Sequence, residues 1–285
     1  MNVYIPSRSR YDRVVDPGRT LHQLMRAPME ELRVFVVVPE DQASDYKEVI
    51  DKAIRDAYSW RNDKFPAVQV LSCPVDGISR VRQWIAQHAE AAGDEHFCMM
   101  DDDLGFLIRK QPGDWHLRAQ TSLETMAMLV YIKELLSDKY AAVGVSPREG
   151  NNRFEECPNV NTRLIRVLAF RTKDFLACEH GRVTVMEDFD ILLQLLRRGL
   201  PNAMTVNYAQ GQKMTQESGG CSDYRSHEVH AVSATTLCSL HPGFVRLREK
   251  KNRSGGAFGQ RKEVTIYWKK AFESSQIVYG SEKNK

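Results

Sequence analysis

The strongest constraint on the fold of this chain is a continuous apolar run, Val-Phe-Val-Val-Val, at residues 34–38. A strand that is apolar at every position suits a sheet covered on both faces, because both sets of its side chains must be buried. Other runs of strand length stand at 3–5, 68–71, 97–100 and 141–145. Helical patterns separate the runs, which is typical of βαβ units. The sequence therefore predicts an α/β fold with a Rossmann-type, mostly parallel central sheet flanked by helices.

Residues that can cap helix N-termini indicate where the intervening helices begin. Ser44 can cap a helix that runs to about residue 60, and Ser79 can cap the next helix. A third helix can begin at either Thr121 or Ser122.

The alternation weakens in the second half of the chain. Residues 147–160 are rich in Pro, Asn, Arg and Glu and indicate a long loop, while 164–170 is typical of a strand and 188–198 of a short helix. The polar stretch 207–235 contains two adjacent glycines, and we expect it to be a mobile loop over a site. Residues 264–268 fit a late strand or a docked tail.

The composition is that of a globular protein. Hydrophobic residues make up 42% and charged residues 27% of the 285 positions, and no apolar run is long enough to span a membrane. The N-terminus becomes polar too soon for a signal peptide, so we expect a cytoplasmic location. The six cysteines include no CxxC pair, which argues against a zinc site.

Three adjacent carboxylates, Asp101, Asp102 and Asp103, directly follow the apolar run at 97–100. Adjacent carboxylates repel one another, and a hard divalent cation such as Mn²⁺ or Mg²⁺ offsets that repulsion. The carboxyl ends of parallel strands are also where open α/β sheets bind their ligands. Helix capping by Asp101 or Asp103 is the alternative.

A glycine turn and two arginines precede the second helix, with Gly77 followed by Arg80 and Arg82. The N-terminus of a helix attracts phosphate through its free amides, and an arginine adds a charged fork. Either this segment binds a diphosphate or the arginines are exposed helix charges.

The first strand runs into a polar and basic turn that contains Pro6, Ser7, Arg8 and Arg10. In a parallel sheet this turn falls on the same edge as Asp101. We expect Arg8 or Arg10 to contact a nucleotide, and Ser7 and Ser9 to bond its base or ribose.

Two further carboxylates, Glu187 and Asp188, stand where an apolar segment enters the short helix. Asp188 is suited either to cap that helix or to act as a general base toward a hydroxyl group.

Residues 246–270 carry nine Lys or Arg against two Glu, although the net charge of the whole chain is only +3. Such a segment suits a polyanion, and the alternative is a solvated basic tail.

The opening strand with Ile-Pro-Ser-x-x-Arg, the glycine-arginine helix start, the strand followed by Asp-Asp-Asp and the downstream Glu-Asp together resemble GT-A glycosyltransferases. More narrowly, they resemble the TET-associated glycosyltransferases of bacteriophages, which act on hydroxymethylated pyrimidines in phage DNA. The resemblance implies a catalytic domain over residues 1–245. Within it, 1–146 would bind the nucleotide-sugar and the loop-rich 147–245 the acceptor, and 246–285 would be a basic extension.

The resemblance also implies roles for the donor side. Asp101 would contact the nucleotide ribose, Asp103 would bind the metal, and Asp102 would share either role. Arg80 would contact the diphosphate of a UDP-sugar, beside Gly77.

On the acceptor side, Asp188 with Glu187 would supply the catalytic base, and His241 would complete the metal shell, with His227 and His230 as rivals. DNA contacts are expected from the basic positions, namely Arg148, Arg153, Lys250, Lys251, Arg253, Arg261 and Lys262.

The enzyme would then work in the cytoplasm of an infected bacterium. A glycan, protein or small-molecule acceptor is the alternative. A nucleotidyltransferase is a further one, although no GxGxRxxxxxK or GxxxxGK[ST] segment occurs.

Overall fold

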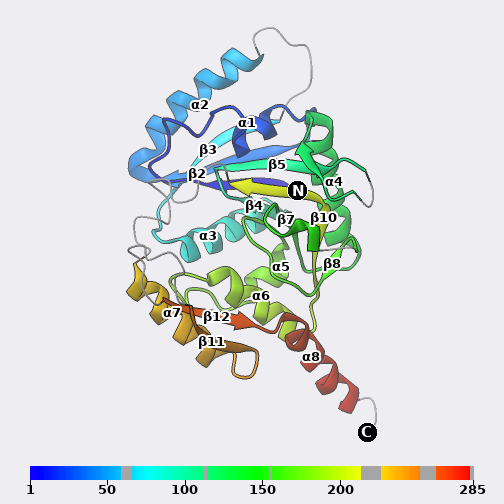
Figure 1. The fold of residues 1–285 in the computed structure, drawn as a ribbon. Helices are drawn as coiled ribbons and strands as arrows, with labels where there is room; N and C mark the ends of the chain where they lie inside the picture. The colour runs from blue at the N-terminus through cyan, green and yellow to red at the C-terminus, as the bar shows by residue number, and fades with distance from the viewer. Residues whose placement is uncertain (59–65, 112–113, 154–155, 213–225, 251–260, 283–285) are drawn as a thin grey trace.

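The computed structural model describes residues 1–58, 66–111, 114–153, 156–212, 226–250 and 261–282. Its strands are β1 (Asn2–Pro6), β2 (Arg33–Pro39), β3 (Ala67–Cys73), β4 (His96–Met100), β5 (Leu104–Arg109), β6 (Leu117–Ala119), β7 (Ala142–Pro147), β8 (Asn159–Val160), β9 (Val167–Arg171), β10 (Asn202–Gln212), β11 (Val245–Lys250) and β12 (Arg261–Ile266). The first ten strands form one sheet in the order β3-β2-β1-β4-β9-β7-β10-β5-β6, with β8 paired to β10 (Figure 1). Strands β11 and β12 form a separate hairpin.

Most strands of the large sheet point the same way. Strands β3, β2, β1 and β4 are parallel neighbours. Strand β9 lies antiparallel between β4 and β7, so β7 runs in the direction of β4, and β10 is parallel to β7. The carboxyl ends of β1, β4, β7 and β10 therefore meet at one edge of the sheet, which we call the carboxyl edge. The predicted α/β fold with a mostly parallel sheet is confirmed.

Helices cover both faces of this sheet (Figure 1). They are α1 (Thr20–Met25), α2 (Ala43–Tyr58), α3 (Ile78–Ala91), α4 (Ser122–Asp138), α5 (Thr172–Leu176) and α6 (Glu187–Arg197). Helices α7 (His227–Leu240) and α8 (Trp268–Glu282) pack instead with α6 and the hairpin, and short 3-10 turns lie at Glu40–Gln42 and Asn151–Arg153. Val36 of β2 packs into one core with α1, α2 and α4, whereas Phe35 packs into a second core with α3, α5 and α6. Because successive strand residues point to opposite faces, the continuous apolar run at 34–38 supplies both cores.

A third core joins the end of the chain to α6. Leu193 and Leu196 of α6 pack with Leu237 of α7, Val245 of β11 and Ala271 of α8. The described part of the chain from Val245 onward therefore packs against α6, the helix that begins with Glu187 and Asp188. The division of the chain into functional parts at residue 245 stays a prediction.

The structure decides between the helix starts that the sequence left open. Thr121 caps α4 in a reciprocal capping box with Glu124, so the helix begins at Ser122. Helix α3 begins after Gly77 and not after Ser79, because Gly77 adopts the positive φ of 85° that turns the chain into the helix. The hydroxyl of Ser79 instead accepts a hydrogen bond of 3.0 Å from the Gly181 N–H.

The prediction of a mobile loop over 207–235 is wrong at both ends. Strand β10 continues to Gln212 and helix α7 begins at His227, while residues 213–225 lie outside the described part of the chain. Within the described residues, no helix is both long and apolar enough to cross a bilayer.

Candidate functional site

The acidic run occupies the turn between β4 and β5 at the carboxyl edge. Asp102 and Asp103 are buried, and the strand residue Leu104 follows directly. No helix begins at this turn, so the capping alternative for Asp101 and Asp103 is wrong. The turn connects β4 with a strand that pairs on the far side of the sheet, beside β10.

The backbone of the acidic run is held from two sides. The N–H of Asp101 donates to the carbonyl of Arg166 at 3.0 Å, just before β9 begins. The hydroxyl of Thr20, the first residue of α1, donates to the Asp101 carbonyl and accepts from the Leu104 N–H at 3.0 Å. The backbone on both sides of the turn is therefore held by α1 and by the segment before β9.

Asp102 is the anchored member of the run. Its carboxylate accepts hydrogen bonds from the hydroxyl of Ser7 and the guanidinium of Arg10, both at 2.5 Å. The Tyr46 hydroxyl lies 2.8 Å from that of Ser7, and burial raises the pKa of Tyr46 to about 12, so the phenol keeps its proton. Both carboxylate oxygens of Asp102 thus accept hydrogen bonds from the turn after β1. Asp102 therefore holds this turn against the acidic run and has no oxygen free to bind a cation.

The negative charges of the Asp101 and Asp103 carboxylates are offset less fully by neighbouring groups than the charge of Asp102 is. Burial raises the pKa of Asp101 to about 7, against the opposing charges of Arg82 and Arg166. Burial, and then the charge of Asp102, raise the pKa of Asp103. The nearest donors to its carboxylate are the Gln212 amide at 3.3 Å and Arg10 at 3.7 Å.

This donor set fits a divalent cation that also binds phosphate. Two carboxylates with excess negative charge, on a rigid turn, are the hard oxygen ligands that Mg²⁺ and Mn²⁺ take together with substrate phosphates. In the described part of the chain, no group of three or more His, Cys, Asp and Glu side chains is arranged to hold an ion by itself. A cation at Asp101 and Asp103 would thus need oxygens from a ligand.

The turn after β1 and the turn before α3 are joined at the same edge. Arg8 donates to Asp76, the residue before Gly77, at 3.1 Å, although both side chains are largely exposed. Arg10, by contrast, is drawn inward to Asp102. Pro6 ends β1 and leads into this turn.

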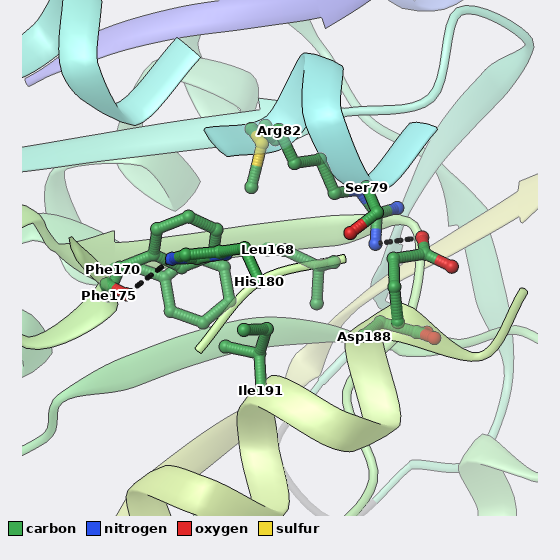
Figure 2. Close-up of a pocket in the computed structure, with 10 residues that line it drawn as sticks. Ser79, Arg82, Leu168, Phe170, Phe175, His180, Asp188 and Ile191 are labelled. Carbon is green, nitrogen blue, oxygen red and sulfur yellow. Dashed lines mark hydrogen bonds and ion pairs between the residues drawn. The ribbon is translucent and has the colours of Figure 1, made fainter. Parts of the chain in front are cut away.

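Arg82, and not Arg80, connects the acidic run with the rest of the site. Arg80 is exposed, whereas the Arg82 side chain is only 12% exposed and its charge lowers the pKa of Asp101. Its Nη1 lies 2.7 Å from Oε1 of Glu187 (Figure 2). Residue 82 shares the buried face of α3 with Ile85, Ala86 and Ala89, and this helical spacing is visible in the sequence.

Glu187 and Asp188 form the first turn of α6. The cap residue is Met186, in a left-handed conformation with φ of 67° and without a side-chain hydrogen bond, so the capping alternative for Asp188 is wrong. Asp188 instead lines a small pocket (Figure 2). The other lining residues are Ser79, Arg82, Met99, Leu168, Phe170, Phe175, His180, Glu187 and Ile191.

His241 belongs to a different, structural cluster. The side chain is fully buried, with Nε2 2.8 Å from Asp190 Oδ1 and Nδ1 3.2 Å from Arg197 Nη1. Arg182 also forms an ion pair with Asp190. Because both ring nitrogens are engaged, the prediction that His241 completes a metal shell is wrong for this arrangement.

The predicted DNA-contacting residues are dispersed. Arg148 follows β7 at the carboxyl edge, where its N–H donates to the Gln210 carbonyl at 2.7 Å. Arg153 is exposed at the end of the 3-10 turn Asn151–Arg153, and Lys262 is exposed on β12. Lys250 pairs with Arg261 through the backbone at the end of the hairpin, and their side chains are not described. Lys251 and Arg253 lie outside the described residues.

The sequence of this chain matches the family described as TET-associated glycosyltransferases over residues 1–220. This match includes the acidic run, Arg82, Glu187 and Asp188. The chain belongs to the TET-associated glycosyltransferase family. The predicted family is confirmed.

Comparisons with individual proteins are more distant. No curated protein sequence matches this chain. Among solved structures, it is similar to Staphylococcus aureus TarS residues 1–349 in complex with UDP, at 15% identity and a TM-score of 0.49 over 83% of this chain and 65% of that chain. It is also similar to GalNAc-T7 with UDP, GalNAc and Mn²⁺, at 11% identity and a TM-score of 0.44 over 74% of this chain and 43% of that chain. This chain thus spans slightly under two thirds of the TarS fragment.

Proposed function

We propose that this glycosyltransferase moves a sugar from a UDP-sugar to the hydroxyl of a 5-hydroxymethylpyrimidine in phage DNA, in a reaction that requires Mn²⁺ or Mg²⁺. The observation that carries the proposal is the position of Arg82. It lies between the acidic run, which suits the donor, and Glu187 beside Asp188, which suits the acceptor. A GT-A type of donor site is consistent with this placement at the carboxyl edge.

On the donor side, Asp103 and Asp101 would hold the cation and Asp101 would also face the ribose. When bound, the cation would supply Lewis-acid stabilisation for the departing diphosphate. The charge of Arg82 lowers the pKa of Asp101, whereas Arg80 is exposed. Arg82 is therefore better placed than Arg80 to stabilise negative charge on the diphosphate. Ser7 and Arg10 would keep Asp102 fixed, so that the run does not rearrange when the donor binds.

On the acceptor side, Asp188 would accept the proton of the attacking hydroxyl. It lines the pocket shared with Arg82 and makes no capping hydrogen bond, so its carboxylate is not committed to the helix end. Glu187 would hold the start of α6 through its ion pair with Arg82. The transition state of glycosyl transfer has oxocarbenium character, which nearby carboxylates stabilise.

A hydroxymethylated base would have to leave the DNA stack to reach this pocket. The DNA acceptor is supported by the family match and by the excess of Lys and Arg over Glu in residues 246–270. Other acceptors, such as a glycan or a small molecule, would use the same donor site.

The decisive experiment is to incubate the enzyme with hydroxymethylated DNA and a panel of UDP-sugars, and to measure nucleoside masses after digestion. We expect a mass increase of one sugar on the hydroxymethylated nucleoside, which EDTA abolishes and Mn²⁺ restores. Unmodified DNA of the same sequence is the control. Transfer from a nucleotide-sugar to other hydroxyl acceptors but never to this DNA would overturn the acceptor assignment.

A further inference from the structure

The β11–β12 hairpin has two chemically different faces. In its register, Val245 pairs with Ile266 and Leu247 with Val264, and the intervening pairs are Arg246 with Thr265 and Arg248 with Glu263. Because successive residues of a strand point to opposite sides, the first two pairs share one face and the last two share the other. The apolar face contributes Val245, Val264 and Ile266 to the third core. We call the other side, with Arg246, Arg248, Glu263 and Thr265, the outer face.

The outer face carries an excess of positive charge. Arg246 is exposed, and the Arg248 side chain is 58% exposed although it pairs with Glu263 at 3.3 Å. Glu263 is the acidic member of the four outer residues, and this ion pair offsets its charge. Lys262 pairs with Glu249 on the other face, so its predicted DNA contact is not part of this surface.

The base of the hairpin is anchored beside Asp188. The ring of Trp268, two residues after β12, packs edge-on against the ring of Phe189 with centroids 5.7 Å apart. The guanidinium of Arg163 lies over the same Phe189 ring, 4.7 Å from its centroid. Burial lowers the pKa of Arg163, while the charges of Asp188 and Glu263 both raise it. Arg163 therefore places a positive charge on Phe189, the residue after Asp188, and interacts electrostatically with both Asp188 and Glu263.

We propose that the outer face of the β11–β12 hairpin, together with Arg163 at its base, binds the phosphate backbone of the acceptor DNA and brings it alongside Asp188. The inference rests on the proposed DNA acceptor and extends it to a specific surface. Arginines on a two-stranded ribbon contact phosphates without reading sequence, which suits an enzyme whose specificity lies in one modified base. The stacking of Arg163 on Phe189 adds a third exposed cation, next in the structure to the residue that follows Asp188.

The test is the salt dependence of DNA binding by the full-length enzyme. The variant Arg246→Gln/Arg248→Gln removes two positive charges from the outer face. The control Lys52→Gln/Arg55→Gln removes two positive charges from exposed positions on α2. Anisotropy of a labelled hydroxymethylated duplex is measured from low to moderate salt, and thermal melting confirms that both variants are folded.

Each lost phosphate contact lowers the slope of log affinity against log salt by about 0.9. We therefore expect the outer-face variant to lose up to about 1.8 in slope, and its KM for DNA in the transfer assay to rise. The control should keep the wild-type slope and KM. Equal slopes for the wild type and the outer-face variant would overturn this inference.

The same assays separate this inference from the proposed function. If the wild type glycosylates hydroxymethylated DNA while the outer-face variant binds and reacts like wild type, the surface is wrong and the function stands. If DNA binding depends on the outer face but no sugar reaches the DNA, the acceptor assignment fails and the surface stands as a DNA-binding face.

Discussion

Arg82 Nη1 lies 2.7 Å from Glu187 Oε1, in an ion pair whose side chains are only 12% and 9% exposed. This contact joins α3, which starts beside the proposed diphosphate site, to α6, which carries the proposed catalytic base. The two halves of the site thus share one salt bridge, and its energetics can be measured directly.

A double-mutant cycle tests that coupling. Arg82→Gln and Glu187→Gln each leave a poorly compensated charge in a buried position, so each should destabilise the fold by about 3–5 kcal/mol. The double variant should recover about 0.5–3 kcal/mol relative to the sum of the two changes. Chemical denaturation measures all four proteins, and strict additivity would show that the pair is not coupled.

Asp103→Asn tests the metal site. The substitution keeps the shape of the side chain but removes a ligand charge, so we expect transfer to fall by at least about 100-fold, the scale of losing one key electrostatic group. Calorimetry should show that Mn²⁺ no longer strengthens UDP binding. The melting temperature should not fall, because the variant relieves repulsion with Asp102. Asp45→Asn, an exposed acid on α2, is the matched control, and full activity in Asp103→Asn would remove the metal assignment.

Asp188→Asn separates catalysis from donor binding. Loss of a general base should lower kcat by about 10²–10⁴-fold while the affinity for UDP with Mn²⁺ stays at the wild-type value. Single-turnover kinetics and calorimetry give the two quantities. Asp41→Asn, an exposed acid near the start of α2, serves as the control. A variant with weakened UDP binding and unchanged kcat would place Asp188 on the donor side instead.

His241→Ala distinguishes a structural histidine from a ligand. Asp190 would keep Arg182 but lose a buried hydrogen-bond partner, which should cost about 1–3 kcal/mol of unfolding free energy. His116→Ala, which removes a contact between an 80% exposed histidine and Asp114, should leave the unfolding free energy close to the wild-type value. Urea denaturation compares the two. If His241→Ala kept its stability and lost metal-dependent UDP binding, the ligand role would return.

Thr121→Ala and Ser122→Ala test the start of α4. Loss of the Thr121 cap should destabilise the protein by about 0.5–2 kcal/mol, because the Glu124 N–H loses its acceptor. Ser122 makes no capping contact, and its replacement should stay within about 0.5 kcal/mol of wild type. Equal losses in thermal or urea denaturation would contradict the observed capping box.

The parts of the fold that the sequence predicts are those with local periodicity. The apolar run at 34–38 indicates a doubly covered strand, and such strands fix the edge where Ser7, Arg10 and the acidic run meet. The antiparallel insertion of β9 is not visible in the sequence, because pairing partners are set by tertiary packing and not by local pattern. The end of β10 has no local signal for the same reason, since its polar residues pair with β5 inside the sheet.

Individual roles within the site were harder to predict than its location. Arg80 and Arg82 have the same chemistry, and only the buried face of α3 separates them. His241 was assigned from resemblance, whereas its partners Asp190 and Arg197 come from α6, far away in sequence. Thr20 and Gln212 carry no local signal, because each acts through contacts with the acidic run that only the folded chain creates.

The third core limits where the chain can be truncated without exposing apolar residues of α6. The family match ends at residue 220, but Leu193 and Leu196 of α6 are covered by Leu237, Val245 and Ala271. A fragment cut at residue 220 would expose that leucine face to water, next to the turn that presents Glu187 and Asp188. Such a fragment would be prone to aggregate, so the last part of the chain serves as a scaffold for the helix that carries the proposed base.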